Sequence, residues 1–481
     1  MSLLRSFVSQ PKNTWWTATL GGMAILLLGV PLVLRQSPTV LLLFIAIPVL
    51  AVTLYSHLEW GTLLLLLLAP VSVVIADFFP DSRLTILRDI ALIGILALWM
   101  LRQQLRGELH LPERFLGAPT RPLFFFGLSV LGGIAIGLLE RSPLQVAFGL
   151  KVLVFYLPLS FIIAAQVKTD EDALRVGRAI VVAAVWSSAY MLFKYLAPAG
   201  VFPQYDRGYR NIGLDDFARF YVSELLRLNA LALPLAGALA FLGRKTALAR
   251  IMDGLAFMFL VIVLVMGSKR IVIIATMVGL LVAIGLVKKW RLGLLVVCAI
   301  AVAFWFLPER GYGRWTDLLE GEDRSSEMRL EELQSFWLPF AWSHPMGSGV
   351  GTFSAVSAFS SAWADIGQGF ATLSWGSVEI RNVHNGFLLV YAELGLVGLV
   401  SYLWLLGSVA TGCVHAIRTS RSATLRSAGI GVVSALIAFA VHDLAAPGII
   451  TFPMSFYFWA VCGLGIAVSR IAGEANNRQG A

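Results

Sequence analysis

The stretch "RNVHNGFLLVYAELGLVG", residues 381–398, places an arginine, a histidine and an asparagine directly before a strongly apolar run. The run continues to about residue 411, which is long enough for a membrane helix, since about 20 apolar residues span a bilayer. Glu393 stands inside the run, where a carboxylate is costly and normally has a partner. The stretch therefore predicts a membrane helix that begins at a polar edge and carries one buried acid.

The composition extends this prediction to the whole chain. Of 481 residues, 58% are hydrophobic and only 14% are charged, and the mean hydropathy is +0.80. These values are typical of a polytopic membrane protein and exclude an ordinary soluble domain. The net charge of +9 is read as a signal of membrane orientation rather than of nucleic-acid binding. The three cysteines lie in or beside apolar runs without paired spacing, which favours buried thiols over disulfides or a metal site.

Apolar runs long enough to cross a bilayer recur along the chain. The run from Thr17 is read as the first span, because no convincing cleavage site for a signal peptide follows it. The stretch 251–287 is interrupted by Ser268-Lys269-Arg270 and predicts a tight helical hairpin. About 14 spans (12–14) are expected, at roughly 17–34, 38–55, 60–77, 84–101, 122–139, 145–166, 177–197, 224–242, 251–267, 271–287, 292–307, 386–411, 428–446 and 450–469.

The basic residues predict the orientation of these spans. With the N-terminus inside, each of several short inside loops carries three or four basic residues, whereas the short outside loops 35–37 and 140–143 carry one each. Both termini are then cytoplasmic, and two larger segments lie outside, at about 198–223 and 308–385. The basic inside loops are 102–121, 167–178, 243–250, 288–291 and 415–427.

We therefore expect an all-α membrane protein in three parts. Residues 1–307 would form a helical bundle of about eleven spans, 308–385 a large outer loop, and 386–481 the C-terminal helices and a cytoplasmic tail. Within the loop, "SEMRLEELQSFWLPFAW" predicts an amphipathic helix lying on the outer membrane surface, with Trp337 and Trp342 at headgroup depth. Its apolar face would hold Leu330, Leu333, Phe336, Trp337 and Phe340.

Basic residues at the outer edge are not explained by orientation. They come from three separate segments, and arginines that converge at one depth suit an anionic ligand such as a diphosphate, because guanidinium binds phosphate bidentately. The alternative is that they reach lipid phosphates or pair with nearby acids such as Asp206 and Asp215. The candidates are Lys269, Arg270, Arg207, Arg210 and Arg381.

His384 is the candidate base, because histidine is the side chain most easily poised to accept a proton near neutral pH. Asn385 is expected to cap the helix that follows. Glu393 lies nine residues beyond His384, about 13 Å along a helix and half a turn round it, so the two side chains cannot touch. We therefore assign Glu393 a supporting role, bracing a neighbouring helix or a basic group.

Two further histidines receive weaker assignments. His344, in "SHPMGSGVGTF", precedes glycines that would form either a tight loop with accessible amides or a simple surface turn. His442 and Asp443, at the start of another outer loop, are assigned a structural role. The chain has no Walker loop and no dinucleotide glycine fingerprint, so nothing in it suggests ATP-driven work.

The ordered set of motifs resembles the O-antigen ligase and polymerase superfamily. The resemblance rests on His384-Asn385 with "ELGLVG" (393–398), "HPMGSGVGTF" (344–353), "GSKR" (267–270) and "YRNIG" (209–213), in the second half of the chain. It implies a bacterial inner-membrane glycosyltransferase whose site faces the periplasm. In that family Arg210 and Arg270 would hold the diphosphate of an undecaprenyl-diphosphate-linked glycan. His384 would activate the acceptor hydroxyl, on a saccharide or lipid A core.

Several alternatives remain open at this stage. The segment after "YRNIG" departs from the family pattern, so Arg207 and Arg227 compete with Arg210 for the diphosphate. No cofactor and no metal are expected, although Asp77 and Asp81 would serve a metal-dependent glycosyltransferase. Within the family, a ligase is favoured over an O-antigen or exopolysaccharide polymerase. A lipid-linked glycan flippase is the alternative of another class, but it would need polar groups near the midplane rather than at one edge.

Overall fold

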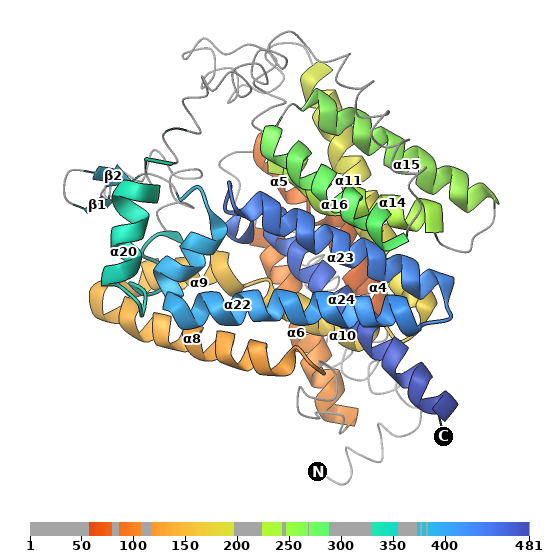
Figure 1. Ribbon diagram of the computed structural model, residues 1–481, viewed down its shortest axis with the longest axis horizontal. Coiled ribbons are helices and arrows are strands. Elements are labelled where there is room, and N and C mark those ends of the chain that lie inside the picture. Colours follow the sequence, from red (N-terminus) through yellow and green to blue (C-terminus); the bar gives the residue numbers. More distant parts are fainter. Residues whose placement is uncertain are drawn as a thin grey trace, which may run out of the picture.

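The computed structural model is a bundle of packed helices (Figure 1). It describes residues 57–78, 86–106, 117–196, 224–242, 247–267, 269–287, 327, 330–331, 333–354, 373–375, 378–380 and 383–480. The predicted spans at 17–34, 38–55 and 292–307 lie outside these residues.

The helices follow the apolar runs of the sequence. Before the segment 308–385 they are α4 (Leu58–Leu68), α5 (Val71–Phe78), α6 (Ile86–Arg106), α8 (Thr120–Glu140), α9 (Pro143–Val154), α10 (Leu157–Gln166), α11 (Asp170–Leu196), the 3₁₀ turn η2 (Glu224–Arg227), α14 (Leu228–Leu242), α15 (Ala247–Met266) and α16 (Arg270–Val287). After it come α22 (Gly386–Thr419), α23 (Ala423–Asp443), the 3₁₀ turn η5 (Gly448–Ile450) and α24 (Met454–Gly480).

Nine helical segments in the described part of the chain are long and apolar enough to cross a membrane. The predicted hairpin at 251–287 is confirmed as α15 and α16. The predicted span at 60–77 is divided into α4 and α5 beside Pro70, a residue that cannot continue a helical hydrogen-bond ladder. The total of about 14 spans stays a prediction, because part of the chain lies outside the description.

The C-terminal helices hold the two halves of the chain together. α23 packs on α14 and α16, α22 packs along α8, and α24 packs on α10 (Figure 1). Two polar side chains of α24 reach carbonyls of the first half. The Tyr457 hydroxyl donates to Leu66, and the Arg470 guanidinium donates to Ala164 at 3.0 Å and Val167 at 2.6 Å.

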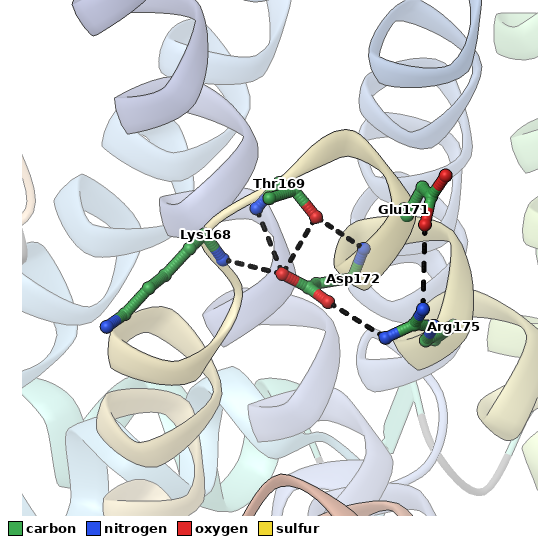
Figure 2. Close-up of polar contacts among 5 residues, drawn as sticks. All are labelled: Lys168, Thr169, Glu171, Asp172 and Arg175. Carbon is green, nitrogen blue, oxygen red and sulfur yellow. Dashed lines mark hydrogen bonds and ion pairs between the residues drawn. The ribbon is translucent and has the colours of Figure 1, made fainter. Parts of the chain in front are cut away.

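The start of α11 shows how a helix end in this bundle is capped (Figure 2). The Asp172 carboxylate accepts hydrogen bonds from the amides of Lys168 and Thr169, and the Thr169 hydroxyl accepts one from the Asp172 amide. Arg175 pairs with Asp172 at 3.3 Å and with Glu171 at 3.5 Å. Reciprocal capping satisfies amides that have no partner within the helix.

The described part of the segment 308–385, the predicted outer loop, contains a short helical segment and a hairpin. The π-helical turn η3 (Leu333–Trp337) leads into α20 (Leu338–Ser343), and the strands β1 (Leu373–Trp375) and β2 (Val378–Ile380) pair antiparallel. The residues that the structure describes are therefore almost all helical, as the predicted all-α class requires, and the hairpin is the one departure among them. In Figure 1 the hairpin and α20 lie at the end of the bundle where α22 begins.

The predicted exposure of this amphipathic segment is partly wrong. Trp337 was expected at headgroup depth, but only 4% of it is exposed, because it packs against Phe336, Phe340 and Phe353. Trp342 is 86% exposed, as a side chain at the membrane surface requires. The apolar face predicted from the spacing thus packs mainly on protein, and the neighbouring face is the exposed one.

Candidate active site

The first turn of α22 is fixed by Asn385. Its side-chain oxygen accepts a hydrogen bond of 3.0 Å from the amide of Leu388, which makes it the helix cap. Its side-chain nitrogen donates to the carbonyl of Leu444 at 3.0 Å, so the cap also joins α22 to the segment after α23. His384 precedes this cap, and its side chain is exposed. A capped helix start thus presents the histidine at the surface of the bundle.

A basic turn joins α15 to α16. Lys269 is buried, with 9% of its surface exposed, and its carbonyl accepts from the amides of Val272 and Ile273. Arg270 follows as the first residue of α16 and is half-buried. A buried lysine is rare unless it has compensating partners. The turn therefore places the side chain of Lys269 in the interior at this end of the bundle.

The end of α23 carries a buried histidine and a buried aspartate. His442 and Asp443 are both fully buried. One oxygen of Asp443 accepts from the amides of Gly448 at 2.5 Å and Ile449 at 3.2 Å. Within the described residues, the other Asp443 oxygen and both ring nitrogens of His442 have no hydrogen-bond partner. Buried polar atoms usually have a hydrogen-bond partner, so each of these atoms calls for an explanation.

Arg227 and Lys269 bring positive charge to this pair. Arg227 bonds to the same segment that holds Asp443, and Lys269 directly precedes α16, which packs along α23. Arg227 ends η2 and donates a hydrogen bond of 3.0 Å to the hydroxyl of Thr451. The ends of α14, α16, α22 and α23 thus meet in one polar cluster, at the end of the bundle that the loop charges predict to face outside.

The segment between α23 and α24, residues 444–453, connects these groups, and we call it the outer clasp. Its carbonyl at Leu444 accepts from Asn385, and its amides at Gly448 and Ile449 hold Asp443. Its hydroxyl at Thr451 accepts from Arg227 and donates to Pro447. The clasp therefore bonds to the cap of α22, the end of α23 and the start of α14.

Glu393 lies deeper in α22 and serves a different structure. Its carboxylate accepts from the amides of Phe353 at 2.9 Å and Ser354 at 2.6 Å, so it binds the glycine-rich loop rather than a basic group. The role expected for it, a brace, is the one these contacts favour. Its partner, however, is backbone, where the sequence suggested a helix or a cation.

The glycine-rich loop can enter the bundle because its glycines adopt backbone conformations that other residues rarely adopt. Gly347, Gly349 and Gly351 all have positive φ, and so does Gly395, where α22 is interrupted. The amide of Ser348 donates to Ala392 at 2.7 Å and that of Leu396 to Pro345 at 2.9 Å, so the loop pairs with α22 around its interruption. Irregular backbone at this depth is tolerated only where protein satisfies it.

His344 lies at the end of α20, at the entrance to this loop. Its ring stacks on Phe340 with centroids 4.5 Å apart, and it hydrogen-bonds the hydroxyl of Ser343 at 2.8 Å. These two contacts hold the His344 ring beside the glycine-rich loop. No contact described for His344 joins it to the cluster of Arg227, Lys269 and His442.

Three predicted diphosphate ligands, Arg207, Arg210 and Arg381, lie outside the described residues. The same is true of Asp81, one of the two acids suggested for a metal. Among the residues that are described, no group of three or more His, Cys, Asp or Glu is arranged to hold a metal ion.

Sequence reasoning underrated two parts of the cluster. Arg227 was only a rival to Arg210, and His442–Asp443 was read as structural, yet these residues stand with Lys269 at the same helix ends. Adjacent ionisable residues at the end of an apolar run were the available signal, because such groups are expensive at a membrane boundary. Their partners could not be found locally, since Arg227 and Thr451 are separated by 224 positions.

A comparison with protein families finds one match over the centre of the chain. The family model described as O-antigen ligase matches residues 255–403. This range holds Lys269, Arg270, His384 and Glu393, and it ends before α23. A search of curated proteins finds no match. The match covers less than a third of the chain, and over those residues it agrees with the resemblance to O-antigen ligases drawn from the sequence motifs.

Proposed function

We propose that the protein is a membrane glycosyltransferase of the O-antigen ligase type, acting at the periplasmic face of the bacterial inner membrane. The donor would be a glycan on undecaprenyl diphosphate, and the acceptor a saccharide, such as the core of lipid A. The observation that carries the proposal is the polar cluster at the capped start of α22, where His384 is exposed, Gly386 lies against Asp443, and Arg227 bonds to Thr451 of the clasp.

The basic residues would bind the diphosphate. Arg270 and Lys269, with Arg227 and the expected Arg207, Arg210 and Arg381, supply cations at one depth. Cations that neutralise the charge developing on a leaving diphosphate lower the barrier to its departure without a metal ion. A long lipid tail would remain in the bilayer beside the helices, so only the headgroup needs a polar site.

His384 would act as the general base. The acceptor hydroxyl attacks the anomeric carbon, the bond from that carbon to the diphosphate oxygen breaks, and the hydroxyl proton passes to the His384 ring. A single displacement of this kind inverts the anomeric configuration. His384 suits the role better than His442, because an incoming acceptor can reach an exposed ring and cannot reach a fully buried one.

Transfer by purified protein tests the proposal directly. With a lipid-linked donor and an acceptor glycan, the wild type should transfer, whereas His384→Ala and Arg270→Ala should lose transfer while protein levels stay normal. Arg102→Gln is a matched control, because Arg102 pairs with Glu59 at a distance of 3.4 Å and neither residue belongs to the cluster. Full activity in either site variant would refute the assignment of that residue.

The same assay separates the alternatives. A flippase would give no covalent product, and a metal-dependent enzyme would stop in EDTA. The glycan profile of a deletion strain distinguishes the two family activities. Loss of all attached glycan indicates a ligase, whereas core that carries only single repeat units indicates a polymerase.

A further inference from the structure

We propose that Arg88 is a positioning residue of the site, acting from the N-terminal half of the chain through Phe452 of the outer clasp. The proposal rests on the function proposed above and extends the site to α6, which lies outside the residues matched by the family model. The contact that carries it is a guanidinium over an aromatic face, with the Arg88 carbon Cζ 3.7 Å from the centroid of the Phe452 ring.

Arg88 is itself held rigidly. Its guanidinium pairs with Asp89 at 2.9 Å and donates to the Ser72 hydroxyl at 3.1 Å. Asp89 is further held by Lys151 at 2.8 Å and by the hydroxyl of Tyr156 at 3.3 Å. Residues of α5, α6, α9 and the turn before α10 thus hold the guanidinium in place. The Phe452 ring that it contacts therefore packs on a fixed group.

Phe452 has the position needed to transmit this rigidity. It follows Thr451 directly, and Thr451 is the residue to which Arg227 donates. The Phe452 ring also lies 6.0 Å from those of Tyr156 and Phe456, so it is clamped between the N-terminal half and α24. A cation over a partly desolvated aromatic face stabilises by an amount comparable to a buried hydrogen bond.

The consequence concerns the diphosphate. With the clasp fixed, the Thr451 hydroxyl holds the Arg227 guanidinium in one direction, and the Leu444 carbonyl holds the cap beside His384. If Arg88 releases Phe452, both anchors loosen together, while the bundle keeps its other contacts. We therefore expect weaker donor binding rather than unfolding.

Steady-state transfer kinetics give the first test. Arg88→Gln and Phe452→Leu should each raise the KM for the lipid-linked donor about tenfold and leave the acceptor KM unchanged. Phe452→Tyr keeps the ring and should restore the wild-type KM. The double variant should be no worse than either single one, because both remove the same contact. Arg102→Gln, on the same helix, is the control and should behave as wild type.

Loop accessibility gives a second test that needs no activity. A cysteine introduced by Ala446→Cys, within the half-buried clasp, should react faster with a membrane-impermeant maleimide in the Arg88→Gln and Phe452→Leu backgrounds than in Arg102→Gln. Unchanged labelling in Arg88→Gln would overturn the proposal. So would a parallel rise of donor and acceptor KM, which indicates a general structural role. If the wild type transfers no glycan, the proposed function fails, and the labelling result still decides whether Arg88 holds the clasp.

Discussion

The carboxylate of Glu393 accepts a hydrogen bond of 2.9 Å from the amide of Phe353, forty positions earlier in the chain. A second bond, from the next amide, makes this acid the anchor of the glycine-rich loop. The only acid in the opening stretch of sequence therefore holds backbone, and the proposed chemistry is assigned to His384, nine residues before it.

Replacing Glu393 tests this anchor. Glu393→Ala leaves two buried amides without an acceptor, and each unsatisfied group costs about 1–3 kcal/mol. Glu393→Gln keeps one oxygen and should cost clearly less. Thermal unfolding in detergent should rank wild type, Gln and Ala in that order. Equal stability of wild type and Glu393→Ala would mean that the loop does not depend on the acid.

Gly349 provides a test of the loop's backbone. A methyl built on this glycine would lie 2.3 Å from the amide nitrogen of Gly137, and its φ of +87° disfavours any other residue. Gly349→Ala should therefore lower the free energy of unfolding by about 1–3 kcal/mol. It should also reduce the monodisperse fraction on size-exclusion chromatography. Gly132→Ala is the matched control, because nothing lies within 4 Å of a methyl there.

Gly386 tests the approach of α22 to the buried aspartate. A methyl on Gly386 would lie 2.2 Å from an oxygen of Asp443, so Gly386→Ala must displace the start of α22 and with it His384. Glycan transfer should fall at least about tenfold, in line with the effect of small displacements at catalytic groups. Gly407→Ala, on the same helix with open space around it, should keep wild-type activity. Normal transfer in Gly386→Ala would mean that the position of His384 does not depend on the contact between Gly386 and Asp443.

Arg227 is expected to matter more than its distance in sequence from the family motifs suggests. Arg227→Gln removes the charge beside His442 and Asp443, and it should reduce transfer about 10- to 100-fold in the purified assay. Arg178→Gln, which breaks a pair with Asp253 of 3.3 Å at the starts of α11 and α15, is the control. Loss of transfer in both variants, without loss of protein, would argue against a specific role for Arg227.

Metal independence follows from a mechanism in which cationic side chains stabilise the leaving diphosphate. Transfer should persist in EDTA at the rate measured in Mg²⁺. A rate that falls in EDTA and returns with a divalent ion would contradict the proposed role of the basic residues, and it would favour the acids at Asp77 and Asp81.

The sequence predicts the helices well because most of them follow a long run of mainly apolar residues. The expected spans 251–267 and 271–287 agree closely with Ala247–Met266 and Arg270–Val287. The interruption of α22 at Gly395 was not predicted, because the residues on both sides of it are apolar. At this interruption α22 pairs with residues 345 and 348 of the glycine-rich loop, more than forty positions earlier in the chain, and no local sequence pattern indicates such a contact.

In the candidate site, too, local features could be predicted from the sequence and contacts between distant segments could not. Asn385 and Lys269 could be placed from the sequence, since each marks the end of an apolar run. The outer clasp could not, because its bonds to Arg227 and Asn385 join segments far apart in the chain. Hydropathy gives the depth of a residue in the bilayer, whereas the neighbour at that depth depends on how helices pack side by side.

The bonds from α24 to the first half of the chain have a consequence for biosynthesis. Tyr457 and Arg470 are synthesised long after Leu66, Ala164 and Val167, yet they bond to the carbonyls of these residues. The helices that carry those carbonyls must therefore remain inserted and incompletely packed until α24 has been synthesised. A nonsense mutation before α24 would then abolish the assembled protein even though every residue matched by the family model had been synthesised.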